Sequence, residues 1–236
     1  MSHNTLELKE GAFLLSDAHY SHRREELLDF IKAIHSKTLL PTQLILMGDI
    51  FDALFGGINY TYIENREMIR LLNDISQEIE VVYLEGNHDF NLQKIFPNVK
   101  VFSLSQQPIK VRYKNQIGFI SHGDVFSGVG YRLFHVVIRN SFILKMLNFF
   151  LGKKLSKYYL TKTNSKKICK KINNFDKIAK QKIDLYDIGL SEVDFIIEGH
   201  YHQGLVLEQK CLYFNLKSYG CDKKYYQIKG DKITLI

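Results

Sequence analysis

Short apolar segments alternate with helical patterns over the first two-thirds of the chain, and this alternation restricts the fold more than any other feature. The runs Ala12–Leu15, Leu44–Met47 and Val81–Leu84 have the length and composition of strands. Between them, apolar residues recur at helical spacing in Glu25–Ser36 and around Glu64–Ile75. This order predicts a layered α/β fold in which helices cover a sheet.

The remaining strand patterns extend this fold into a single domain over residues 1–236. Ile109–Tyr113 and Ile117–Ser121 flank three polar residues and predict a hairpin. The tail predicts a mostly antiparallel sheet that closes the domain. After a strand at Asp194–Ile197, the strands of this tail are expected at Leu205–Leu207, Leu212–Asn215, Tyr225–Ile228 and Ile233–Leu235.

Residues 130–182 break the alternation, as an insertion would. Polar residues form one helical stripe before residue 140 and a second stripe after it, about half a turn away at 100° per residue. The two stripes are Arg132, His135 and Arg139, then Ser141, Lys145 and Asn148. One continuous helix would be polar on two opposite faces, so two short helices separated by a break near Asn140–Ser141 explain the two stripes better. Their apolar faces either cap the domain's own core or form a lid for an apolar ligand or a membrane, so we expect a helical lid at about 128–184.

The net charge of +7 is concentrated in one segment. Residues 153–182 hold eleven lysines and one acidic residue, Asp176, which is a local charge of +10 and leaves −3 for the rest of the chain. A lysine-rich helix in solvent would account for this excess. The alternative is a surface for phosphates or anionic lipid.

The composition is that of a soluble globular protein, with 45% hydrophobic and 24% charged residues. Cys169, Cys211 and Cys221 show no CxxC spacing, and their odd number predicts reduced thiols in a cytosolic protein. The N-terminus has no basic segment followed by an apolar run, and no stretch reaches about 18 consecutive apolar residues. We therefore expect a cytoplasmic protein.

Five short motifs each begin where a predicted strand ends. They are Ser16-Asp17-Ala18-His19, Gly48-Asp49, Gly86-Asn87-His88-Asp89, Ser121-His122-Gly123-Asp124 and Gly199-His200-Tyr201-His202. Because ligands of α/β sheets bind at the carboxyl ends of the strands, these motifs are expected to converge. Their oxygen and nitrogen donors suit Mn²⁺, Fe²⁺ or Zn²⁺, and the absence of cysteine argues against a structural zinc finger.

This ordered set resembles the calcineurin-like metallophosphoesterase superfamily, whose pattern is D-x-H, G-D, G-N-H-D/E, H-G and G-H-x-H. The resemblance covers Asp17 to His202. It implies an α/β four-layer sandwich, with helices outside two packed sheets and metals at the strand tips. It also implies two divalent metal ions, for which we expect Mn²⁺, with Fe²⁺ or Zn²⁺ as alternatives.

The same resemblance implies a role for each motif residue. One ion would be held by Asp17, His19, Asp49 and His202, and the second by Asp49, Asn87, His122 and His200. A bridging Asp49 is physically sensible because it screens two cations about 3.5–4 Å apart. His88 would stabilise the substrate's phosphoryl oxygens or protonate the leaving group, and Asp89 would orient His88. A hydrogen-bonded loop histidine is the alternative for His88.

Three further features resemble one branch, the UDP-2,3-diacylglucosamine pyrophosphatases of the lipid A pathway. Glu85–Phe90 is similar to their E-G-N-R-D-F block, although His88 stands where the best-known members have Arg. The helical insertion and the basic helix follow His122 as in those enzymes, and Tyr213–Tyr219 looks like their closing strands. The branch implies hydrolysis of UDP-2,3-diacylglucosamine to UMP and 2,3-diacylglucosamine 1-phosphate.

An acylated sugar nucleotide needs an apolar slot and cations. Residues 131–151 are expected to supply the slot and residues 153–182 the cations, with each buried CH₂ contributing about 0.8 kcal/mol. Arg132, Asn164 and Lys167 are candidate substrate contacts. We therefore expect a peripheral position on the anionic surface of the inner membrane.

Three other functions compete with this hypothesis. A soluble dimetal phosphodiesterase or phosphatase would act on nucleotides or phosphoproteins, without need of acyl chains. A nuclease would use the lysine segment, but few aromatic residues lie among those lysines, so no nucleic-acid partner is expected. A non-catalytic scaffold is disfavoured because every implied metal ligand and His88 are present. The sequence carries no prediction of the oligomeric state.

Overall fold

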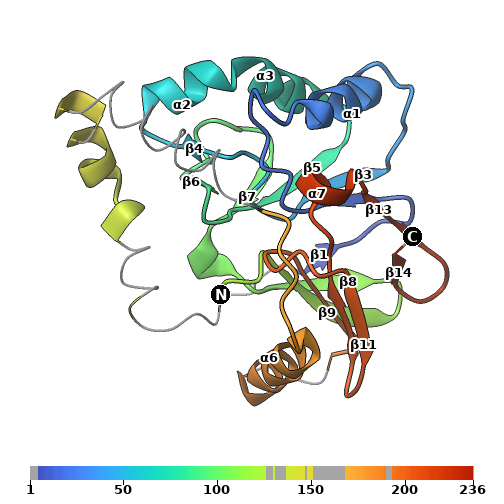
Figure 1. The fold of residues 1–236 in the computed structure, drawn as a ribbon. Helices are drawn as coiled ribbons and strands as arrows, with labels where there is room; N and C mark the ends of the chain where they lie inside the picture. The colour runs from blue at the N-terminus through green and yellow to red at the C-terminus, as the bar shows by residue number, and fades with distance from the viewer. Residues whose placement is uncertain are drawn as a thin grey trace.

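Two six-stranded sheets pack face to face, and helices cover their outer faces (Figure 1). The computed structural model describes residues 5–125, 130, 137–146, 148–150, 168–189 and 193–235. The first sheet has the order β1 (Leu6–Glu7), β8 (Ile109–Tyr113), β9 (Gln116–Ser121), β10 (Phe195–Glu198), β12 (Leu212–Asn215) and β11 (Leu205–Glu208). The second has the order β14 (Thr234–Leu235), β13 (Tyr226–Lys229), β2 (Phe13–Leu15), β3 (Gln43–Leu46), β5 (Glu80–Leu84) and β7 (Lys100–Phe102).

The helices and a small third sheet complete the described part of the chain. The helices are α1 (Glu26–His35), α2 (Asn59–Glu64), α3 (Arg66–Ile75), a 3₁₀ turn at Leu104–Gln106, α6 (Phe175–Gly189) and α7 (Tyr219–Asp222). The third sheet pairs β4 (Leu54–Phe55) with β6 (Asp89–Phe90). In Figure 1, α1 and α3 lie on one side of the sheets and α6 on the other. The predicted fold class, two packed sheets flanked by helices, is confirmed.

After Gln43 and Glu80 at their first positions, the central strands β3 and β5 of the second sheet are continuously hydrophobic, as is typical of strands that are buried on both faces. Side chains alternate along a strand, so β3 sends Leu44 and Leu46 toward α1 and α3 and sends Ile45 toward the first sheet. Val81 and Val82 of β5 divide in the same way. One continuous apolar run therefore builds two hydrophobic cores.

Helix α6 covers the outer face of the first sheet. Phe175, Ala179 and Ile183 recur every four residues, are buried, and pack with Ile196 and Tyr213 of the sheet. The first part of the helix overlaps the predicted lid range and the lysine-rich segment, yet the helix forms an outer layer of the sandwich. The sheet therefore holds the C-terminal part of the predicted insertion.

The tail differs from the prediction of one closing antiparallel sheet. β11 and β12 join the first sheet, where β12 also pairs in parallel with β10, whereas β13 and β14 join the second. The predicted hairpin of β8 and β9 is confirmed. The predicted helix around Glu64–Ile75 is divided at Asn65, whose side-chain amide donates to the carbonyls of Ala53 and Thr61.

The described residues of the insertion between 137 and 150 lie beside α2, where the Asn59 amide donates to Asn148 Oδ1 at 3.3 Å (Figure 1, yellow). The chain leaves the helical conformation at Asn140, and the Asn140 side chain accepts from the amides of Phe142 and Ile143, as an N-cap does. The expected break near residue 140 is therefore present. Leu144 of the following helix is buried against Phe55 and Phe90. Among the described residues, no helix is long and apolar enough to span a membrane.

A disulfide joins Cys169 to Cys221 of α7, with 5.6 Å between the Cα atoms. The prediction of three reduced thiols is therefore wrong for this pair, while Cys211 lies buried on the first sheet. Fifty-two residues separate the two cysteines in the sequence. Their pairing depends on how the part of the insertion around Cys169 meets α7, which spacing alone does not show.

We expect reduction of this disulfide to lower the free energy of unfolding by about 2–4 kcal/mol, because the unfolded chain gains freedom. Urea unfolding with and without dithiothreitol measures the change. Dithiothreitol should have no effect on a Cys169→Ser variant. Alkylation of all three cysteines in the unreduced, denatured protein would contradict the pairing.

Candidate metal centre

The five motifs lie at the carboxyl ends of five strands, as expected. Asp17, Asp49 and Asn87 follow β2, β3 and β5, which are neighbouring parallel strands of the second sheet. His122 and His200 follow β9 and β10, a parallel pair in the first sheet. Because both sheets end at the same side of the sandwich, ligands from each meet there.

The structure brings six of the seven predicted ligands into two clusters. Asp17, His19 and His202 form one and Asp49, His122 and His200 the other, with the ligand atoms of each cluster within 4.8 Å of one another. Asn87 stands in the loop after β5, and the backbone amide of the next residue, His88, donates to Asp49 Oδ1 at 2.8 Å. Each cluster holds residues that the resemblance assigns to one ion, with Asp49 only in the second, and a third group of His19, Asp52 and His88 overlaps the first at His19.

Unpartnered polar atoms point to what these residues hold. His19 Nε2 and Asn87 Oδ1 are buried and have no hydrogen-bond partner within the described structure. Such atoms are costly unless something else satisfies them. A divalent cation is the partner that suits an imidazole nitrogen and an amide oxygen beside two carboxylates. The donor set therefore fits a pair of divalent ions.

Backbone carbonyls orient two of the imidazoles. His122 Nδ1 lies 2.9 Å from the carbonyl of Met47, and His202 Nδ1 lies 2.8 Å from the carbonyl of Ile168. A carbonyl only accepts, so Nδ1 donates in both. The opposite nitrogen, Nε2, then faces a carboxylate, Asp49 at 3.6 Å for His122 and Asp17 at 3.0 Å for His202. A histidine that ligates a metal is commonly held by its other nitrogen in this way.

Five of the predicted ligands have left-handed backbone conformations that are unfavourable for residues with a side chain. Their φ angles lie between 49° and 64°, at Asp17, His19, Asp49, His200 and His202. Each left-handed residue turns the chain sharply after its strand. These strained backbone conformations direct the side chains of the five residues toward one another, as the two clusters show.

The electrostatics of the clusters follow from burial and pairing. Burial raises the pKa of Asp17, but the charge of His202, its hydrogen bond and the charge of His122 together outweigh burial and hold that pKa at about 2. Burial also raises the pKa of Asp49, but His122, His88 and His19 together outweigh burial and hold it well below its usual range. Burial and the nearby His122 lower the pKa of His200 to about 4. Burial lowers the pKa of His122 and His202, but nearby carboxylates outweigh burial and raise the pKa of both. Ionised carboxylates and the neutral imidazole of His200 are the forms that bind a cation.

His88 is positioned by a residue other than the one predicted. Its Nδ1 lies 2.8 Å from the carbonyl of Asp52, and its ring centroid is 4.9 Å from that of His19. The predicted orienting residue, Asp89, instead accepts from the backbone amides of residues 49–51 and 86 and from the hydroxyl of Tyr83. Asp89 thus holds the Asp49 loop, and the role predicted for it toward the His88 ring is wrong.

Asp52 is a residue that the sequence reasoning missed. Its Oδ1 lies 3.4 Å from His19 Nδ1, and Arg24 pairs with its other oxygen while donating to the carbonyl of His19. The carboxylate therefore orients His19 from behind. It lies in the motif loop three residues after Asp49, but nothing in the sequence distinguishes it from a surface aspartate.

A second missed group lies beneath His122 and His200. The carboxylate of Glu198 is fully buried and accepts from Lys182, Ser121, Tyr186 and Tyr213. Lys182 also donates to the carbonyl of Gly123, next to His122. The sequence predicts Lys182 as part of a basic surface for the substrate, but its ammonium group is buried in this network.

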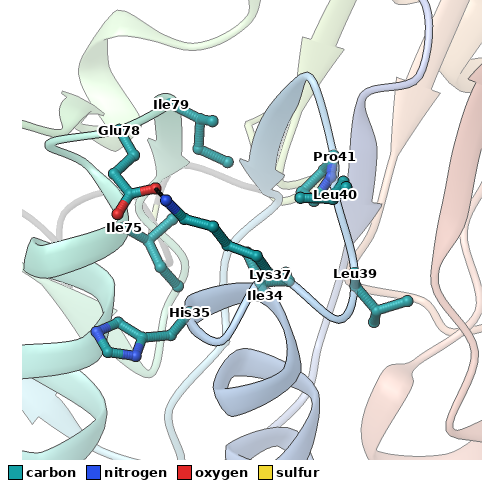
Figure 2. A pocket seen from close by; sticks show the side chains of 9 residues that line it. All are labelled: Ile34, His35, Lys37, Leu39, Leu40, Pro41, Ile75, Glu78 and Ile79. Atoms are coloured by element: carbon teal, nitrogen blue, oxygen red, sulfur yellow. Dashed lines mark ion pairs between the residues drawn. The ribbon is translucent and has the colours of Figure 1, made fainter.

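Other candidate residues and cavities lie elsewhere. Arg132, Asn164 and Lys167, the predicted substrate contacts, lie outside the described residues. The pocket of Figure 2, closed on one side by the Lys37–Glu78 ion pair, lies before β3 and β5 in the chain. It is therefore at the opposite ends of these strands from the metal ligands.

We expect Lys182→Met to lower the free energy of unfolding by about 3–5 kcal/mol, because it leaves the Glu198 charge buried without its cation. Chemical unfolding measures the loss. The matched control is Lys180→Met, an exposed lysine on the same helix, which should change stability little. Equal stability of the two variants would contradict the role assigned to the buried pair.

The chain is similar to several known proteins. A UDP-2,3-diacylglucosamine hydrolase of Wigglesworthia glossinidia brevipalpis is 27% identical over 203 residues, 81% of this chain and 79% of that one. The protein of the same name from Vibrio parahaemolyticus is 25% identical, covering 80% of each chain. Among solved structures, Yfce, a phosphoesterase from E. coli, aligns over 95% of this chain and 96% of that one at 13% identity, with a TM-score of 0.46.

The family model described as calcineurin-like phosphoesterase matches residues 13–204. The chain belongs to the calcineurin-like phosphoesterase family and is a metal-dependent phosphoesterase.

Proposed function

We propose that this phosphoesterase hydrolyses the pyrophosphate of UDP-2,3-diacylglucosamine, releasing UMP and 2,3-diacylglucosamine 1-phosphate. The observation that carries the proposal is an exposed apolar surface joined to the metal-ligand loop. Phe142, Phe149 and Phe150 of the insertion are 70%, 82% and 70% exposed. The same segment packs through Leu144 against Phe90.

An exposed cluster of aromatic side chains marks a site for an apolar partner. Phe90, which is buried against Leu144, follows His88 and Asp89 in the chain, so the segment that carries these aromatic side chains is anchored beside the metal-ligand loop. An acyl chain on this surface would bring an attached phosphate near the metal ligands. The names of the relatives from Wigglesworthia and Vibrio support the same substrate class.

The residues of the centre divide the chemistry between them. The two ions, for which we propose Mn²⁺, would polarise the phosphoryl group and supply a nucleophile from water at neutral pH. Asp17, His19, Asp49 and His202 would hold one ion, and Asp49, Asn87, His122 and His200 the other. His88, held by the carbonyl of Asp52, borders these ligands and would donate to the phosphoryl or leaving oxygen when protonated.

We place the protein at the anionic surface of the inner membrane, through the exposed face of the insertion. Aromatic side chains at an interface enter the acyl boundary, and nearby lysines favour anionic headgroups. The alternative is a dimetal phosphodiesterase or phosphatase that acts on nucleotides or phosphoproteins, which His88 in place of Arg favours. The two functions differ in whether hydrolysis requires acyl chains on the substrate.

The substrate is tested by offering the Mn²⁺-loaded protein three compounds. They are UDP-2,3-diacylglucosamine in detergent, a UDP-sugar without acyl chains, and an aryl phosphodiester. We expect UMP release from the acylated compound in large excess over the others. Asp49→Asn should reduce this activity by roughly 10³-fold or more, because both ions lose a carboxylate. Equal turnover of all three compounds by the unaltered protein would favour the alternative.

Membrane association is tested with the double variant Phe149→Ser and Phe150→Ser. Loss of two aromatic side chains, each worth about 1.5–3 kcal/mol when buried, should strongly reduce sedimentation with phosphatidylglycerol vesicles. Leu40→Ser is the matched control, because Leu40 is 74% exposed but lies at the opposite end of the strands. Unchanged sedimentation of the double variant would exclude this surface as the contact.

A further inference from the structure

Arg139 reaches from the insertion to the loop that carries Asn87 and His88. Its Nη1 donates to Glu85 Oε2 at 3.1 Å, and its Nη2 donates to the carbonyl oxygen of Gly86 at 2.6 Å. That carbonyl belongs to the peptide group whose N–H is that of Asn87. The guanidinium therefore binds both the residue before the metal-ligand motif and the peptide plane that leads into Asn87.

We propose that Arg139 is a positioning residue for the metal centre, which holds the Asn87–His88 loop against Asp49 from the insertion. The loop needs such support because Asn87 Oδ1 has no hydrogen-bond partner among the described residues that would fix it. On its other side the loop has no room to move. A Cβ at Gly86 would overlap Asp49, so the backbone is held between Asp49 and the Arg139 guanidinium.

The contacts around Arg139 differ from those of a surface ion pair. The Arg139 and Glu85 side chains are only 12% and 4% exposed, so little solvent screens them. The guanidinium also lies over the Phe90 ring, 5.1 Å from its centroid. Asn91 Nδ2 donates to the backbone carbonyl of Arg139 at 2.7 Å. The loop and Arg139 are therefore joined by hydrogen bonds in both directions.

The chemistry at this position calls for arginine specifically. A guanidinium is a planar fork, which donates to a carboxylate and a carbonyl in the same plane. A lysine ammonium at the same place would reach one acceptor or the other. Leu144, buried against Phe55 and Phe90, fixes the same segment to the core from the next helix. The position of the insertion is thereby coupled to the geometry of the metal ligands.

The test measures Mn²⁺ binding to the metal-free protein by calorimetry, which needs no substrate. We expect Arg139→Met to weaken one of two binding events by roughly 10- to 100-fold, the usual effect of losing a group that orients a ligand, and to leave the other unchanged. Arg139→Lys should be intermediate. Turnover of a water-soluble aryl phosphodiester should fall in kcat with little change in KM.

Arg70→Met is the matched control, because Arg70 forms an exposed ion pair with Asp74 on α3. It should leave both binding events unchanged. Wild-type Mn²⁺ affinity in Arg139→Met, with only a lower melting temperature, would overturn the proposal. Should Arg139→Met fail to fold, Arg139→Lys decides, since wild-type affinity in that variant would equally overturn it. These outcomes are independent of whether the acylated sugar nucleotide is the substrate.

Discussion

The buried carboxylate of Asp89 is the group on which the metal centre depends most. It accepts from the amides of Asp49, Ile50 and Phe51 after β3, from the amide of Gly86 after β5, and from the hydroxyl of Tyr83. Burial and the charge of Asp49 raise the pKa of Asp89 to about 7, and these donors oppose that rise. One side chain thus closes two ligand loops onto each other. The left-handed turn at Asp49 is held in place by these bonds.

Glu198 has the corresponding position in the first sheet. It lies at the end of β10, fully buried, and binds α6, β9 and β12 through Lys182, Ser121 and Tyr213. A buried carboxylate thus supports the ligand loops of each large sheet, Asp89 from β6 for the second sheet and Glu198 from β10 for the first. Buried charges of this kind are costly unless they are fully paired, and their pairing here specifies how the loops sit. The hydrogen bonds of Asp89 and Glu198 therefore form a buried polar layer between the hydrophobic cores and the loops that carry the predicted metal ligands.

The convergence of the five motifs was predictable because their signal is local. Each motif follows an apolar strand, and parallel strands that end at one side of a sandwich bring their next residues together. The break in the insertion was predictable for a similar reason, since helical periodicity fixes which residues share a stripe. The hydrogen-bond partners of Asp89 and His88 could not be predicted from the sequence. They depend on how the loops after β3 and β5 pack, and a motif that places Asp89 next to His88 does not contain that information.

The sequence by itself determined the fold class, the strands and helices of the core, and the residues of the candidate metal centre, because hydrophobic periodicity and short motifs act over a few residues. Tertiary structure decided the rest. It divided the tail between two sheets, paired Cys169 with Cys221, and buried Lys182 against Glu198. It also brought Arg139 onto the loop of Asn87 from more than fifty residues away. These contacts join distant segments, and their formation depends on how whole layers pack.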